Sequence, residues 1–94
     1  MIILSAKSNK PTNPFKILKK SEGQTILVKL KDGTEYVGKL DLVDNTMNIV
    51  LTDCTRYDSN GNPAARYDVI LIRGSHIAYI SLNYEKVAPE AIKK

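Results

Sequence analysis

Two runs of alternating apolar and polar residues meet at a short polar bend, Asp44-Asn45-Thr46, and this pattern constrains the fold most strongly. Upstream of the bend, the positions that share one side of an extended chain are Tyr36, Gly38, Leu40 and Leu42. Downstream of it, they are Met47, Ile49 and Leu51. A period of two is typical of strands with one buried face. The sequence therefore predicts two strands whose connection lifts polar side chains to the rim of a small sheet.

The chain before these strands has the signals of one short helix. Asn13 suits the N-cap and Pro14 the first helical position, so a helix is expected over residues 15–21, and Gly23 ends it. Its lysines lie opposite its apolar side. These lysines are Lys16, Lys19 and Lys20. They form either a solvated face of an amphipathic helix or a basic surface that faces a nucleic-acid backbone.

Strand and turn signals occupy the rest of the chain up to residue 82. Asp32-Gly33 predicts a tight hairpin, and Gly38 inside a strand predicts a bend or a close backbone approach. The expected strands are Thr25–Lys31, Glu35–Val43, Met47–Tyr57, Arg66–Ile72 and His76–Leu82. The predicted fold class is all-β: a small, five-stranded, strongly bent antiparallel barrel with a short N-terminal α-helix. Residues 1–12 are expected to be a flexible leader, 13–82 the domain, and 83–94 a tail.

The last two predicted strands lack clean alternation. Val69–Ile72 and Ile77–Ile80 are almost continuously apolar, as in strands that are covered on both faces. A domain of 94 residues has a single core, so a second copy of the same protein is the expected cover.

Composition excludes several classes of function. A net charge of +4 is compatible with a polyanionic partner, and the one cysteine, Cys54, is expected to be a buried strand residue in a reducing compartment. No secretion signal or membrane span is visible, so we expect a cytoplasmic protein without a membrane partner. His76 and Cys54 lie in separate strands, and no metal-ligand spacing or phosphate-binding glycine loop occurs. We therefore expect no enzyme activity, no cofactor, no metal and no small-molecule substrate.

Two polar bends carry side chains that suit a nucleobase. The Asn48 amide can pair with a base edge, and Arg73, in the bend Ile72–Ser75, offers a planar guanidinium for stacking. Asp44 can accept from the Asn48 amide and fix its orientation. A hydrogen-bonded turn and a solvated arginine explain the same residues equally well.

At these positions the chain resembles the Sm and Sm-like (LSm) family, in its archaeal and eukaryotic form, from Asn13 to about Leu82. The first motif corresponds to Val28-Lys29-Leu30-Lys31-Asp32-Gly33, then Gly38, Asp44 and Met47-Asn48. The second corresponds to Ile72-Arg73-Gly74 and the strand His76–Leu82.

This resemblance implies a ring, commonly of seven subunits, that binds uridine-rich single-stranded RNA at its pore and acts in RNA processing. Adjacent subunits would pair the fourth strand of one with the fifth of the next. Asn48 would contact the base edge, Arg73 would stack on the base, and Asp44 would brace Asn48. The implied RNA-binding residues are Asp44, Thr46, Met47, Asn48, Arg73, Gly74 and Ser75.

Two of these positions depart from the family pattern. Thr46 stands where many RNA-binding members have a histidine or another stacking side chain, and Ser75 where an acidic or amide residue is frequent. The alternative function is therefore a structural or protein-interaction ring with weak or lost RNA affinity. A monomeric oligonucleotide-binding barrel is a third possibility, although successive strands lack exposed aromatic residues.

Overall fold

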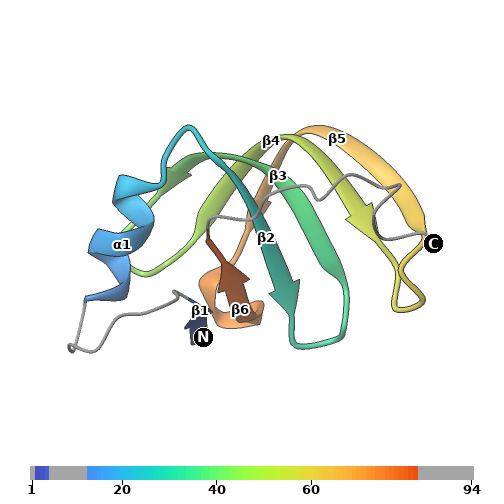
Figure 1. Cartoon of the computed structure of the whole chain (residues 1–94), viewed down its shortest axis with the longest axis horizontal. Coiled ribbons are helices and arrows are strands. Elements are labelled where there is room, and N and C mark those ends of the chain that lie inside the picture. Colours follow the sequence, from blue (N-terminus) through green and yellow to red (C-terminus); the bar gives the residue numbers. More distant parts are fainter. Residues whose placement is uncertain (1, 5–12, 83–94) are drawn as a thin grey trace.

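The computed structural model of the chain describes residues 2–4 and 13–82, which form one strongly bent sheet with a short helix at one side (Figure 1). The elements in chain order are β1 (Ile2–Leu4), α1 (Pro14–Lys20), β2 (Thr25–Leu30), β3 (Glu35–Val43), β4 (Ile49–Tyr57), β5 (Pro63–Ile72), the 3₁₀ turn η1 (Gly74–His76) and β6 (Ile77–Ser81). None of the helices in this part of the chain is long and apolar enough to cross a membrane.

The helix α1 forms as the sequence predicts, one residue earlier at each end. The Asn13 side chain accepts a hydrogen bond of 2.9 Å from the backbone nitrogen of Phe15, which caps the helix. Leu18 is fully buried against the sheet, and the three lysines of α1 are exposed. The helix thus closes one end of the apolar interior.

The strand order in the sheet is β1-β6-β2-β3-β4-β5. Strands β2 to β6 pair antiparallel with their neighbours and give the five-stranded barrel that was predicted. The main shifts in bounds are that β5 starts at Pro63, and that residues 74–76 form η1 before β6 begins.

The leader differs from expectation, because Ile2–Leu4 forms β1. This strand pairs parallel with β6, and the two lie side by side in Figure 1. Three apolar residues are too few to show periodicity, and their partner lies far along the chain, so no local signal predicts the pairing. The rest of the leader and the 83–94 tail lie outside the described residues.

Gly38 lets β3 approach the backbone of β4 closely, which is one of the two alternatives that the sequence predicts. The residues on either side of Gly38 pair with Thr55 and Thr52, so Asp53 and Cys54 together oppose one position, which is a β-bulge. A Cβ atom on Gly38 would lie 2.9 Å from the Cβ of Cys54. Any side chain at Gly38 would therefore push the two strands apart.

A second irregularity in β3 overturns one sequence expectation. Leu40 pairs with Leu51 but Leu42 pairs with Val50, so β3 advances two residues while β4 advances one. The extra residue turns Leu42 outward, where its side chain is 55% exposed, and Val43 is buried instead. Leu42 therefore does not share the buried side of Leu40, because a one-residue shift reverses the facing of a strand.

The interior of the barrel is continuous and apolar. Its buried residues are Leu18, Ile26, Val28, Tyr36, Leu40, Val43, Ile49, Leu51, Cys54, Ile72, Ile77, Ile80 and Leu82. Cys54 is fully buried, as predicted, and burial raises the pKa of its thiol to about 11.

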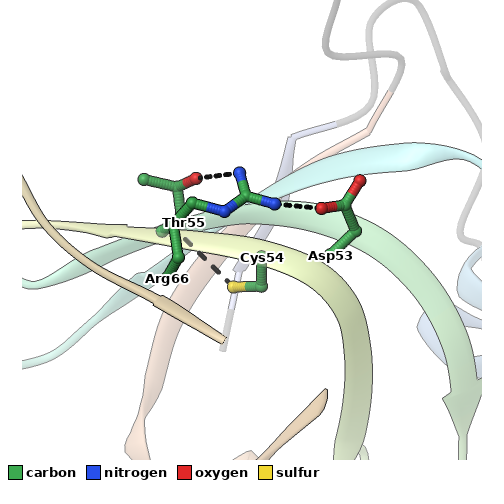
Figure 2. A network of polar contacts seen from close by, with 4 residues as sticks. All are labelled: Asp53, Cys54, Thr55 and Arg66. Carbon is green, nitrogen blue, oxygen red and sulfur yellow. Dashed lines mark hydrogen bonds and ion pairs between the residues drawn. The ribbon is translucent and has the colours of Figure 1, made fainter. Parts of the chain in front are cut away.

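The bulge at Asp53 carries a polar network on the solvent side of the sheet (Figure 2). Arg66 pairs with the carboxylate of Asp53 and also donates to Thr55 Oγ1 at 3.2 Å. Asp53 has a φ of 50°, which is unusual for a residue other than glycine. The exposed Arg66 side chain thus links β5 to the bulged part of β4, although an exposed ion pair stabilises a fold only slightly.

The edge strand β5 presents apolar side chains to solvent. Val69 is 63% exposed and Leu71 is 61% exposed. This matches the prediction of a strand that is apolar on both faces. In β6, by contrast, Ile77 and Ile80 are fully buried within the chain itself.

Candidate functional site

The carboxylate of Asp44 organises the bend between β3 and β4. Its Oδ1 accepts three hydrogen bonds: from the Thr46 nitrogen at 2.9 Å, from Thr46 Oγ1 at 2.8 Å and from the Asn48 nitrogen at 2.9 Å. These donors, the Thr46 hydroxyl foremost, lower the pKa of Asp44 below its ordinary value of 3.8. Asp44 is therefore ionised at neutral pH, and it holds the bend in one conformation.

The backbone of the bend is closed by two further hydrogen bonds. The backbone nitrogen of Met47 donates to the carbonyl oxygen of Asp44 at 2.9 Å. The backbone nitrogen of Asp44 donates to the carbonyl oxygen of Asn48 at 3.1 Å. Met47 has a φ of 69°, a left-handed conformation that is uncommon outside glycine. Its half-buried side chain packs against the core, and this contact holds the strained position in place.

The side-chain amide of Asn48 makes three hydrogen bonds within the chain. Nδ2 donates to Asp44 Oδ2 at 3.1 Å and to Thr46 Oγ1 at 3.0 Å. Oδ1 accepts from the Gly74 nitrogen at 2.8 Å. The predicted bracing of Asn48 by Asp44 is confirmed, and the same amide joins the two bends directly.

Gly74 lets the two bends touch. A Cβ atom at Gly74 would lie 2.5 Å from the Thr46 carbonyl oxygen and 2.8 Å from the Met47 carbonyl oxygen. A side chain would collide with backbone that cannot move aside easily. The sequence places Gly74 in the motif, but the reason for it, a close approach to the distant 44–48 bend, appears only in the structure.

The remaining two candidate residues flank Gly74. Arg73 and Ser75 are exposed, and the Arg73 carbonyl accepts from the His76 nitrogen at 3.0 Å to start η1. Among residues 2–4 and 13–82, the Arg73 guanidinium forms no ion pair. Arg73 directly precedes Gly74, whose nitrogen binds the Asn48 amide, so its backbone lies where the two bends meet.

All seven candidate residues thus lie on two loops in contact, as predicted. The structure adds that the Asn48 nitrogen is turned inward, toward Asp44 and Thr46, and that the Thr46 hydroxyl serves as donor and acceptor at once. The RNA-binding role of each residue stays a prediction.

A bent sheet with five antiparallel strands, an N-terminal helix and two polar loops in contact place the chain in the class of small, strongly bent β-barrels. The chain belongs to the LSM domain family, which matches residues 16–82. The resemblance to the Sm and Sm-like family, inferred from the two motifs, is thereby confirmed.

Similar sequences come from eukaryotes and archaea. The chain is 38% identical over 77 residues to the U6 snRNA-associated Sm-like protein LSm6 of Debaryomyces hansenii, covering 82% of this chain and 89% of that protein. It is 41% identical over 68 residues to a putative snRNP Sm-like protein of Thermococcus sibiricus, covering 72% of this chain and 88% of the relative.

Solved structures with the same fold include archaeal Sm proteins. One is the Pyrococcus abyssii Sm protein in complex with a uridine heptamer, with a TM-score of 0.72 and 33% identity, covering 77% of this chain and 100% of that one. Another is a heptameric archaeal Sm protein, with a TM-score of 0.66 and 30% identity, covering 73% of this chain and 98% of that one.

Proposed function

We propose that this protein is a non-catalytic RNA-binding protein that assembles into a homo-oligomeric ring, a heptamer, and acts in RNA processing in the cytoplasm. Uridine-rich single-stranded RNA would bind at the pore. The observation that carries the proposal is the hydrogen bond from Gly74 to Asn48, which joins the bend of Asn48 to the bend that begins with the exposed Arg73. The similar archaeal proteins, one bound to a uridine heptamer and one heptameric, support it.

The base preference follows from the hydrogen-bonding capacity of the Asn48 side chain that is not used within the chain. Its two N–H groups are directed to Asp44 and Thr46, and one lone pair of Oδ1 is taken by Gly74. The remaining lone pair is an acceptor, which matches the N3–H donor of uracil. Cytosine has an acceptor at N3, so it would face the amide oxygen with repulsion. The site therefore favours uridine over cytidine.

Arg73 supplies the stacking surface and the positive charge. Its guanidinium is exposed and is not paired with an acidic residue in the described part of the chain. A planar cation of this kind stacks on a base and attracts the phosphate next to it.

The assembly uses two strand edges, the edge of β5 and the edge of β6 that β1 covers in the single chain. A head-to-tail contact between copies closes into a ring when the rotation between them allows it. In this sheet, such a contact joins the β5 edge of one copy to the β6 edge of the next. Val69 and Leu71 would then lose their solvent exposure.

The test is a titration of uridine and cytidine oligomers, with the native mass measured alongside. Arg73→Ala should weaken uridine binding about 5- to 150-fold, because losing a stacked base costs about 1–3 kcal/mol, and should leave the ring mass unchanged. Arg66→Ala is the matched control, since it removes the same charge from the solvent face of the sheet. Equal affinity for both variants would place RNA elsewhere on the protein.

A structural or protein-interaction ring with weak RNA affinity is the second candidate. It is favoured by Thr46, which has no π-face and whose hydroxyl is already engaged by Asp44 and Asn48. A ring of the expected mass that binds neither oligomer at micromolar concentration would support this function over the first.

A further inference from the structure

The edge of β6 is already occupied by the chain's own N-terminal strand. In β1, Ile2 pairs with Tyr79, Ile3 with Ile80 and Leu4 with Ser81, all in parallel orientation. On its other side, β6 pairs with β2. The described sheet therefore ends in β1 at one side and in β5 at the other.

This arrangement conflicts with ring closure. In the ring proposed above, the β5 strand of a neighbouring copy pairs with the β6 edge, and the same backbone groups cannot serve β1 as well. Resting on the ring proposed above, we propose that β1 is an exchangeable edge strand that occupies the place of the neighbouring copy's β5 until subunits assemble.

The two occupants of the β6 edge differ in strength. β1 is 3 residues long and parallel, whereas β6 has 5 residues to pair and β5 has 10. Antiparallel pairing is slightly more stable per residue than parallel pairing, and β5 additionally brings Val69 and Leu71, which are 63% and 61% exposed in the single chain. The neighbour's strand should therefore displace β1 once it is present at sufficient concentration.

A starting point for this exchange is visible. β1 pairs with residues 79–81 and leaves Ile77 and Ala78 without a partner on that edge in the described part of the chain. A neighbouring β5 strand can pair first with this free segment and then replace β1 one residue at a time. Until then, the covered edge protects a lone subunit from unspecific edge-to-edge pairing.

Deletion of Ile2–Leu4 is the main test. Without its competitor, the β6 edge is always available, so the concentration at which half the protein is in rings should fall. The apparent affinity of a contact is reduced by the fraction of the competent state, so an edge that is free about one tenth of the time gives a roughly tenfold shift. The measurement is the mass distribution on dilution, by light scattering or mass photometry. The control replaces all three residues by valine, which preserves strand propensity and should behave as the parent.

An engineered disulfide that holds β1 on β6, as a reversible lock, should have the opposite effect and prevent ring assembly. Leu4→Cys combined with Ser81→Cys places two thiols at paired positions, while Cys54 is buried and stays reduced. The oxidised protein should remain a single subunit, and reduction should restore the ring.

The outcomes separate this inference from the proposed function. A ring that forms at the same concentration with and without Ile2–Leu4, or that forms equally well in the oxidised lock, overturns the exchange but leaves the ring in place. Failure of the two cysteines to cross-link in protein diluted to single subunits also overturns it, because β1 would then not lie on β6. If the parent, the deletion and the reduced lock are all monomeric at the highest concentration, the ring itself is wrong.

Discussion

The side-chain oxygen of Asn48 accepts a hydrogen bond of 2.8 Å from the backbone nitrogen of Gly74, which lies 26 positions later in the chain. This bond joins two loops that are separated by two strands in the sequence. The same amide is held on its nitrogen side by Asp44 and Thr46. The position of Asn48 is therefore fixed from three directions before any ligand arrives, which is the preorganisation that a specific binding site needs.

Asn48→Asp tests this arrangement through charge. The new carboxylate still accepts from Gly74, but it replaces a donor that lies 3.1 Å from the Asp44 carboxylate by a like charge. We expect a loss of about 1–3 kcal/mol of stability at pH 7, from the two lost hydrogen bonds of the Asn48 nitrogen and the repulsion. Part of this loss should be recovered near pH 4, where one carboxylate becomes protonated. Urea unfolding at the two pH values measures it. Asn45→Asp, in the same exposed bend, is the control, and an equal loss there would contradict the specific role of Asn48.

Gly74→Ala tests the contact between the loops. The added methyl group would lie 2.5 Å from the Thr46 carbonyl oxygen, so the loops must separate. Overpacking of this kind typically costs about 1–3 kcal/mol, measured as a lower urea midpoint at unchanged slope. Ser75→Ala, one residue on and exposed, should change stability by less than about 0.5 kcal/mol. Similar midpoints for the two variants would show that the loops are not held in contact.

The pKa of Asp44 gives a pH-dependent prediction. Because hydrogen bonds to the folded state lower this pKa below 3.8, the stabilisation is fully present above that value and is lost as the pH falls through the lowered pKa. An NMR titration should show the Asp44 carboxyl and the Gly74 amide responding together, with a midpoint below 3.8. Thr46→Val removes the hydroxyl that contributes most to the shift, so the midpoint should rise, while Thr52→Val should not move it. A parent midpoint above 3.8 would contradict the hydrogen-bond geometry.

Replacing Thr46 by an aromatic residue should create a second stacking surface opposite Arg73. Base–aromatic stacking contributes about 1–3 kcal/mol, so Thr46→Tyr or Thr46→His should tighten uridine binding about tenfold or more per site. The two hydrogen bonds of the Thr46 hydroxyl would be lost, so the same variants should unfold at lower urea concentration. Oligomer titrations and unfolding curves separate the two effects. The gain should vanish when Arg73→Ala is added, and a folded, ring-forming variant without any gain would favour the purely structural ring.

The ring is tested most cleanly on β5. Leu71→Asp changes a side chain that is 61% exposed in the single chain, so it should block assembly and leave the fold intact. Ile80→Asp is unsuitable for this purpose, because Ile80 is fully buried and its substitution would unfold the subunit itself. Thr25→Asp, an exposed position on the interior strand β2, is the control. Light scattering should give a subunit mass for Leu71→Asp and a ring mass for the control, and a ring mass for both would exclude β5 from the interface.

The sequence predicted those elements whose signals are local. Asn13-Pro14 marks the helix start, Asp32-Gly33 marks the first hairpin, and β3 has the expected bounds. The predicted facing of Leu42 was wrong. The bulge in β3 depends on the pairing with β4 and does not show in the alternation of apolar and polar residues. β1 was missed for a related reason, since Ile2–Leu4 takes its conformation from β6 alone.

The candidate site was predictable in its members but less so in its geometry. Asp44, Asn48 and Arg73 stand out as polar residues at bends between apolar strands. Both N–H groups of the Asn48 amide donate within the bend, and this could not be predicted. It requires the Thr46 hydroxyl to accept one N–H while the Gly74 nitrogen donates to the amide oxygen. Short-range chemistry was visible in the sequence, whereas contact between distant loops was not.

The burial of Cys54 opposite Gly38 gives the protein a built-in probe of its own breathing. The pKa of the Cys54 thiol is about 11 and the residue has no exposed surface. The thiol is therefore inert to reagents at neutral pH while β3 and β4 stay paired around it. A thiol reagent can reach Cys54 only when β3 and β4 separate at the bulge. The labelling rate therefore reports how often the barrel opens at this place. Every variant above retains Cys54, and the same measurement therefore distinguishes a substitution that loosens the barrel from one that acts only at its rim or edge.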